Sequence, residues 1–276
     1  MRNVILLMLF CCSANASIYS CVDDSGKKVL RSDPCEQNEK QKVTEKLITP
    51  SISIGEKRKF EHLPDVAKAI VGGQPILIPA PNSLFQATSP RMIQSAELSI
   101  IKEDRLLAVF GTATDVGNGE FLMERYGLVQ ATRNVEPYQI PLDRFAKYKD
   151  DTKAEAVAGM SAVDRAEIQR NINRTTDWIA SDMGVKLQVG VPSVGSFVIL
   201  NETPTSLTMV TKMTAPVQVA GGNQKSVEMV EGMSLMLVKS KVIWLQLYAR
   251  SNSREDFDWV VMNIVKWTRA VGAANP

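Results

Sequence analysis

Methionine side chains gather in one predicted sheet region near the C-terminal end of the chain: Met209, Met213, Met229, Met233 and Met236. Thioethers of exported proteins can bind Cu(I), which prefers soft ligands. They can also line an adaptable apolar surface for a lipid or peptide, or simply fill an irregular core. Met233 and Met236 lie an odd number of residues apart, so a regular strand points them to opposite sides. This weakens the copper hypothesis, and we expect no cofactor. The candidate ligand-binding residues here are Met209, Met213 and Met233.

Tryptophans are the second kind of candidate binding residue, because their rings can form a platform for sugars. Trp244 lies in a predicted apolar strand, while Trp178 and Trp267 lie on predicted helices, so partial burial is expected for all three. Trp259 lies beside the main apolar stripe of the last helix. Trp259 is therefore the tryptophan expected to be exposed, and it joins the candidate ligand-binding residues.

Familiar catalytic patterns are missing from the sequence. It contains no HExxH, GxSxG, P-loop or GxGxxG motif. Its one histidine, His62, lies beside a charged segment, where a solvated side chain is the ordinary case. Hydrolysis by a pair of carboxylates remains open, because two such groups can come from anywhere in a fold. The acidic group at 255, 256 and 258 instead fits the first turn of a helix, where it complements the dipole.

Two cysteines remain if the N-terminus is a signal peptide. Arg2 precedes a short apolar run over residues 4–12 and an Ala-Asn-Ala site at 14–16, which predicts cleavage before Ser17. Cleavage leaves Cys21 and Cys35, and two nearby cysteines in an exported chain predict one disulfide. It would close a loop of about 15 residues and contribute roughly 3 kcal/mol. A zinc site or redox pair is less well supported, since neither a nearby histidine nor CxxC spacing is present.

The segment around these cysteines reads as a hairpin, with strands at 18–22 and 27–31 joined by an Asp-Asp-Ser-Gly turn. The pattern Tyr-x-Cys-x-Asp-x-x-Gly, a short strand and Ser-Asp-Pro-Cys resembles a small bacterial domain of unknown function found just after signal peptides. The matching residues are Tyr19, Cys21, Asp23, Gly26, Ser32, Asp33, Pro34 and Cys35. Family members commonly have one more residue between the Asp and the Pro. The resemblance covers residues 17–40 and implies an envelope location without a biochemical activity.

The elements that must position the candidate residues follow from hydrophobic periodicity. The stretches 227–238 and 242–250 predict an apolar hairpin, and Ser253 with Asp256 predicts the capped start of a helix that ends near Gly272. That helix is expected to lie on the hairpin before it. Earlier in the chain we expect a helix over 64–71, an extended edge segment over 75–81, and strands at 105–112 and 126–132.

The middle of the chain predicts helices followed by strands. One helical region begins at 141–149, Thr152 and Glu155 suggest a capping box, and a longer helix covers 161–183. Strands are expected at 185–191, 197–200 and 207–212. The order of strands, helices, strands and helix predicts an α+β fold: an antiparallel sheet with helices packed on one side, preceded by a small disulfide-pinned β-hairpin. In element order, residues 75–272 are similar to the PsbP-like/DcrB-like envelope proteins, which implies the same arrangement and transfers no site residue.

The charge balance excludes some classes of partner. The whole chain has 32 basic and 30 acidic residues, so removal of Arg2 leaves a net charge of +1 and no basic field for nucleic acid. We expect a signal peptide (1–16), a Cys-hairpin segment (17–40), a polar linker (41–62) and one α+β domain (63–276). No segment after the signal peptide is expected to span a membrane.

The sequence therefore predicts a periplasmic, non-catalytic binding or accessory protein. Its expected partners are a lipid, peptide or glycan ligand, or another envelope protein. A carboxylate-dependent hydrolase acting on an envelope polymer is the alternative.

Overall fold

The main sheet places the candidate residues. The computed structural model describes residues 65–119, 124–159, 162–183, 187–219, 224–250 and 253–276, and the backbone of three short strands before them. Within this part of the chain, nine strands form an antiparallel sheet in the order β10-β12-β13-β14-β8-β7-β6, and β9 and β11 also pair with β12. Their bounds are β6 (Phe85–Gln86), β7 (Asp104–Gly111), β8 (Arg125–Thr132), β9 (Leu187–Val189), β10 (Ser193–Val194), β11 (Val198–Thr203), β12 (Ser206–Val219), β13 (Lys225–Val238) and β14 (Lys241–Arg250). The predicted α+β class is confirmed.

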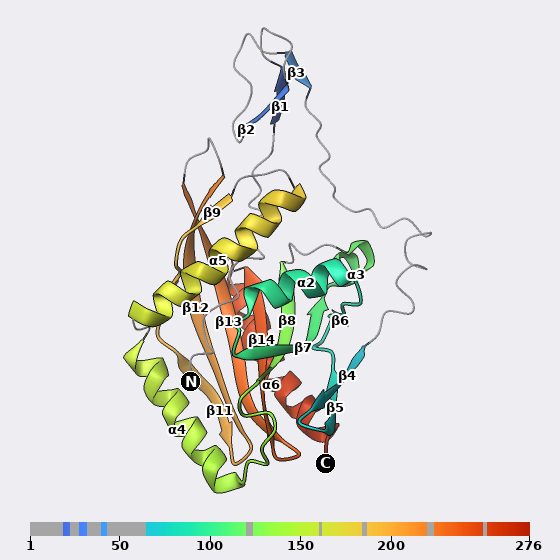
Figure 1. Ribbon diagram of the computed structural model, residues 1–276, viewed down its shortest axis with the longest axis vertical. Helices are drawn as coiled ribbons and strands as arrows, with labels where there is room; N and C mark the ends of the chain where they lie inside the picture. The colour runs from blue at the N-terminus through green and yellow to red at the C-terminus, as the bar shows by residue number, and fades with distance from the viewer. Residues whose placement is uncertain are drawn as a thin grey trace.

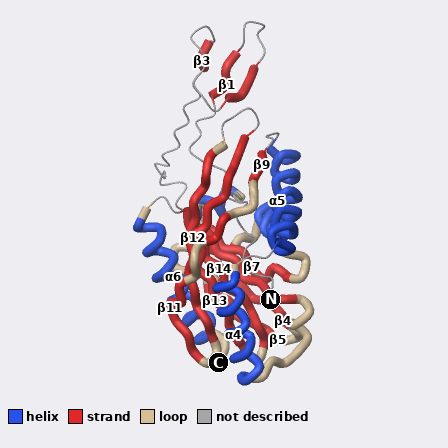
Figure 2. Tube along the Cα trace, turned by 90° about the vertical axis from the view of Figure 1, so that its left-hand side faces the viewer, coloured by secondary structure: helices blue, strands red, loops and turns tan. Residues whose placement is uncertain are grey.

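Helices cover both faces of this sheet (Figures 1 and 2). Helices α2 (Pro90–Ser99), α4 (Leu142–Ala158) and α5 (Ala162–Met183) lie over one face, while α6 (Arg254–Ala273) lies on the other; α3 (Ala113–Asn118) follows β7. The order of elements in the sequence predicted helices on one side only. Long runs of successive residues are buried instead, over 206–211 in β12, 229–236 in β13 and 241–249 in β14, so both faces of the sheet are apolar and each is covered by helices.

The C-terminal hairpin and helix form as predicted. Strand β14 pairs along its whole length with residues 229–238 of β13, around a two-residue turn in which Lys239 (φ 48°) and Ser240 (φ 61°) are both left-handed. Such a turn matches the right-handed twist of the strands it joins. The Ser253 hydroxyl accepts a 3.2 Å hydrogen bond from the Asp256 amide and caps α6. The helix then packs its apolar stripe on the hairpin, through Val260, Ile264, Trp267 and Val271.

The expected helix over residues 64–71 is a strand. Strand β4 (Val66–Val71) pairs with β5 (Gln74–Pro79) around Gly72 and Gly73, whose φ values are +51° and +82°. The alanines and lysine of β4 favour a helix. However, β4 alternates exposed and buried residues, and this two-residue period matches a strand that covers the core with one face. Strand β5 confirms the expected extended segment.

Side chains from other elements hold this second sheet in place. The Asn275 side chain accepts from the Leu77 amide (2.9 Å) and donates to the Leu77 carbonyl (2.7 Å), as a neighbouring strand would. The Trp267 indole donates to the Pro79 carbonyl at 2.6 Å, and Arg105 donates to the Ile70 carbonyl at 2.6 Å. The hairpin is therefore part of the main domain.

The central helices differ from expectation at one boundary. The proposed capping box at Thr152 lies inside α4, where the Thr152 hydroxyl donates to the Tyr148 carbonyl one turn earlier. A buried Thr152 can satisfy its hydroxyl within the helix, so the helix continues past it. Helix α5 begins at Ala162 and ends at Met183, which confirms the helix predicted over 161–183. No helix that the structure describes is long and apolar enough to cross a membrane.

The N-terminal strands form a small antiparallel sheet in the order β2-β1-β3. Strands β1 (Tyr19–Val22) and β2 (Lys28–Arg31) confirm the expected hairpin, and β3 (Lys40–Lys42), at the end of the hairpin segment and the start of the expected linker, adds a third strand on β1. The predicted signal peptide, Cys35 and the remainder of the linker lie outside the described residues. The disulfide therefore stays a prediction.

Candidate functional site

A row of buried polar side chains crosses the sheet on the face covered by α2, α4 and α5. Cross-strand pairing places Thr211, Glu231, Tyr248 and Tyr126 side by side on β12, β13, β14 and β8. Each is at most 2% exposed. We call these four residues the polar row. Burying polar groups between apolar layers is costly unless each finds a partner, so this row is the feature of the sheet that most needs an explanation.

Methionine pairs flank the polar row on both sides. Met213 pairs with Met229 on one side, and Met209 pairs with Met233 on the other. The first pair belongs to the apolar cluster shared with α2 and α5, and the second to the cluster shared with Phe145 of α4. The polar row therefore marks the boundary between the part of the sheet covered by α5 and the part covered by α4.

Glu231 has one partner for two carboxyl oxygens. Its Oε1 accepts a 2.7 Å hydrogen bond from the Tyr248 hydroxyl, and the Tyr248 ring stacks on Tyr126 with centroids 4.7 Å apart. Its Oε2 is buried and has no hydrogen-bond partner in the part of the chain that the structure describes. Burial raises the pKa of Glu231 from 4.5 to about 8, an effect that the bond from Tyr248 partly offsets. Burial also raises the pKa of Tyr248 well above 10.

This arrangement supplies an uncharged acid at neutral pH. Because Oε1 accepts from Tyr248, the proton of Glu231 is available on Oε2, where it can be donated to an acceptor atom. Beside the row, the Gln130 amide donates to the Gln246 carbonyl oxygen at 2.6 Å, and both side chains are buried. Glu231 can therefore form a hydrogen bond with an uncharged group inside an apolar environment that is rich in methionine. Among the described residues, no group of three or more His, Cys, Asp and Glu side chains is placed to hold a metal ion.

The structure brings the three candidate methionines to one face of the sheet. Met209, Met213 and Met233 are at most 2% exposed and all border the polar row. Met236 lies on the opposite face against α6, as the odd spacing from Met233 predicted. These three buried methionines therefore lie beside a buried carboxyl group, on the same face of the sheet.

Trp259 is not part of this arrangement. It lies on α6, on the far face of the sheet, and it is only half-buried. The Arg125 guanidinium covers its ring at 5.0 Å and donates to Asp256 Oδ1 at 2.9 Å. Asp256 is also bonded to Ser253 at the start of the helix. The acidic group at 255–258 thus serves the helix start, as its position predicted.

The other candidates from the sequence lie elsewhere. Cys21 is on β1, but Cys35 and His62 lie outside the described residues. Trp244 and Trp267 are buried on opposite faces of the sheet, and Trp178 packs partly against the cluster under α5.

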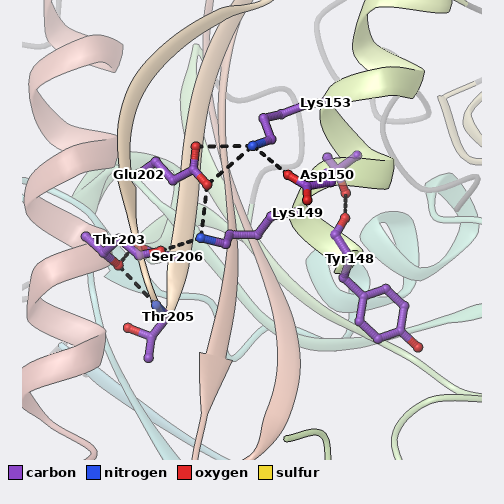
Figure 3. A network of polar contacts seen from close by, with 9 residues as sticks. Tyr148, Lys149, Asp150, Lys153, Glu202, Thr203, Thr205 and Ser206 are labelled. Carbon is purple, nitrogen blue, oxygen red and sulfur yellow. Dashed lines mark hydrogen bonds and ion pairs between the residues drawn. The ribbon is translucent and has the colours of Figure 1, made fainter. Parts of the chain in front are cut away.

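A charged network protects the edge of the sheet at β11 (Figure 3). Lys149 and Lys153 of α4 point toward Glu202 of β11, with Nζ–Oε distances of 3.0 and 3.4 Å. The Lys149 ammonium also donates to the Thr203 carbonyl at 2.6 Å. A helix that occupies backbone acceptors in this way keeps an edge strand from pairing with another chain. We therefore assign this network a structural role.

A second buried carboxyl group is too far from Glu231 to work with it. Burial raises the pKa of Asp104 to about 7, against a hydrogen bond with Thr132 that lowers it. Asp104 pairs with Thr132 on β8, whereas the polar row crosses β8 at Tyr126, six residues earlier. At about 3.3 Å per residue, the two carboxyl groups are separated by roughly 20 Å along the strand.

Glu231 and Tyr248 are the residues that sequence reasoning missed. Glu231 lies two residues from both Met229 and Met233 in a predicted strand, and side chains two residues apart share a face. An acidic residue at one of the alternating strand positions that are otherwise apolar is the pattern that would have identified Glu231. Tyr248 reads as an ordinary apolar strand residue, and only the strand pairing shows its role.

Comparison with known protein families gives a match in the N-terminal segment. Residues 5–50 match a family described as a domain of unknown function (DUF4124). No curated protein matches the chain. The N-terminal segment is thus similar to a domain of unknown function, and this match covers the residues of the cysteine pattern.

Proposed function

We propose that this chain is an exported envelope protein whose α+β domain binds a ligand or partner without catalysing a reaction. The three-part signal pattern at the N-terminus supports export. The match of residues 5–50 to a domain of unknown function agrees with the resemblance seen in the cysteine pattern, which implies an envelope location.

One observation carries the binding proposal: a buried carboxyl group with an unpartnered oxygen, set among methionines on one face of the sheet. Native cores rarely leave such atoms without a partner, and an exception calls for an explanation such as a bound molecule. Methionine side chains suit an adaptable binding surface, because they are unbranched and polarisable. We do not favour catalysis because, among the described residues, the other buried carboxyl group with a raised pKa is that of Asp104, which lies roughly 20 Å away and cannot act together with Glu231.

The hydrolase alternative rests on the pKa of Glu231. A carboxyl group with a pKa of about 8 is protonated at neutral pH, as a general acid must be. A second carboxylate within about 10 Å of it would be needed for glycoside hydrolysis. Turnover of an envelope glycan that is lost in a Glu231→Gln variant would favour the hydrolase over the binding protein.

Two measurements test the proposed function. The intact mass of protein recovered from a bacterial periplasm should correspond to a chain that begins at Ser17, and reduction should raise that mass by 2 Da if Cys21 and Cys35 form a disulfide. Full-length mature protein should then gain thermal stability with envelope lipids, peptides or glycans, since a ligand that binds only the folded state stabilises it. Retention of the first 16 residues would overturn export, and no shift with any fraction would overturn binding.

A further inference from the structure

Three buried polar atoms without partners belong to the elements that enclose one apolar cluster. They are Ser95 Oγ on α2, Asn171 Nδ2 on α5 and Glu231 Oε2 on β13. Each side chain is at least nine-tenths buried, with exposed fractions of 0%, 9% and 1%. None of the three atoms has a hydrogen-bond partner among the described residues. Unpaired polar atoms thus occur both in the polar row of the sheet and in the helix layer that covers this face of the sheet.

The neighbours of these residues place them around the same cluster. Ser95 lies on the buried face of α2 with Met92 and Ala96. Asn171 lies on the buried face of α5 next to Ile172. Met92, Ala96 and Ile172 pack in one cluster with Met213, Met229 and Tyr248, which is the hydrogen-bond partner of Glu231. Two helices and the sheet thus each contribute one unpaired polar group to the border of a single apolar interior.

The three groups share one hydrogen-bonding property, which is that each can donate. Asn171 Nδ2 carries two N–H donors and Ser95 carries a hydroxyl. Glu231 is protonated at neutral pH and donates through Oε2. A buried donor left without an acceptor costs free energy, so three of them around one cluster select a molecule that brings acceptor oxygens.

The charged groups near this interface do not form a binding site for an anion. Arg250 lies on the same face of β14, two residues after Tyr248, and has an interaction of its own. Only burial and the Tyr248 bond shift the pKa of Glu231. Arg174 of α5 is bound to the Leu98 carbonyl, and Lys149 of α4 is bound to Glu202. The interface therefore favours an uncharged molecule.

We propose that the interface between the sheet and helices α2 and α5 binds an uncharged ligand that combines an apolar chain with acceptor oxygens, such as an acyl ester, and that Ser95, Asn171 and Glu231 donate to those oxygens. This inference rests on the proposed binding function and names the ligand class. The apolar chain would lie among Met92, Met213 and Met229, whose flexible side chains can rearrange around it.

The test compares two probes with the same hydrocarbon chain. Monoolein is an uncharged ester, whereas oleate is an anion at neutral pH. Binding of each to the full mature protein is followed at pH 7 through tryptophan fluorescence, since Trp178 packs against the cluster. Monoolein should bind saturably and at least ~10-fold more tightly than oleate, because the carboxylate of oleate must be desolvated to enter an apolar interior.

Variants separate hydrogen bonding from general packing. Glu231→Ala and Asn171→Ala should each weaken monoolein binding by ~10-fold or more, as expected when a buried bond to the ligand is lost. Glu231→Gln keeps an N–H donor and should stay within about 3-fold of the wild type. Glu228→Gln, at an exposed position on the same strand, is the matched control and should change nothing. Circular dichroism of each variant checks that it folds.

Each other outcome overturns the inference. Equal binding of the two probes, or unchanged monoolein binding by Glu231→Ala and Asn171→Ala, would refute the proposal that these side chains donate hydrogen bonds to the ligand. So would a high-resolution experimental structure of probe-soaked protein in which water alone bridges the three atoms. If neither probe binds but an envelope peptide or glycan stabilises the protein, the ligand class is wrong and the proposed binding function stands. If no envelope fraction binds, both fail.

Discussion

The protonation of Glu231 should make the stability of this protein fall as pH rises through neutrality. Its pKa is about 8 in the folded protein, against an ordinary value of 4.5. Between these two values the folded state holds one proton more than the unfolded state. The free energy of unfolding therefore decreases with increasing pH across this window, and levels off above the folded pKa.

The size of the effect follows from the width of the window. Each pH unit of the difference corresponds to about 1.4 kcal/mol, so the full effect is on the order of 5 kcal/mol. Local opening that lets water reach the carboxylate limits this loss. We expect a decrease of at least ~2 kcal/mol between pH 5 and pH 8 that is specific to Glu231.

Urea unfolding of the wild type and of Glu231→Gln at pH 5, 6, 7 and 8 measures this difference. Glutamine keeps an acceptor for Tyr248 but does not titrate, so the stability of the variant relative to the wild type should rise with pH. Asp104 titrates in both proteins and cancels in the comparison. Glu228→Gln, exposed on the same strand, controls for the loss of one carboxylate. Parallel pH profiles for the wild type and Glu231→Gln would refute the reasoning.

Three further predictions concern the packing around the site. Lys149→Ala should lower the free energy of unfolding by about 2 kcal/mol, because it removes a buried side chain whose ammonium bonds both Glu202 and the Thr203 carbonyl, whereas the exposed Lys147→Ala should cost under ~0.5 kcal/mol in the same urea titration. Asn275→Ala should release the backbone of Leu77, so hydrogen exchange of that amide should speed up by ~10-fold or more; unchanged exchange would contradict the pairing. Gly232→Ala places a Cβ 2.8 Å from a valine methyl of α6 and should lower stability by about 1–3 kcal/mol, whereas a neutral result would mean that α6 can shift away.

Sequence periodicity predicted the elements whose pattern has one interpretation. The last helix combines a Ser253 cap with apolar residues at helical spacing, and both features appear in the structure. The sequence pattern also predicted the two strands on either side of residues 239–240. Here local propensity and tertiary packing favour the same conformation, which is when sequence patterns are most informative.

The prediction failed where propensity and packing disagreed. Residues 66–71 contain good helix formers, but their alternation fits a hairpin that Asn275 and Trp267 hold by side-chain bonds. Those partners are roughly 190 residues away in the sequence, so no local pattern could show them. The one-sided helix layer failed for a related reason: strands apolar on both faces require cover on both, and the sequence does not say which helix provides it.

The sequence predicted the methionines of the candidate site but not its buried carboxyl group. The methionine cluster was recognised, and its division between two faces at Met233 and Met236 followed from spacing alone. Glu231 was missed because a single carboxylate in a strand usually points to solvent. The burial and hydrogen bonding of Glu231 depend on the strand register, which pairs it with Tyr248, and on the helix layer that covers it.

Native mass spectrometry of the mature protein purified from a bacterial periplasm tests the central claim most directly. The account predicts that the wild type and Glu228→Gln retain an uncharged adduct of defined mass, and that Glu231→Ala has lost it. A wild-type protein that carries no adduct under gentle ionisation, or an adduct retained equally by Glu231→Ala, would contradict the claim that this buried carboxyl group belongs to a ligand site.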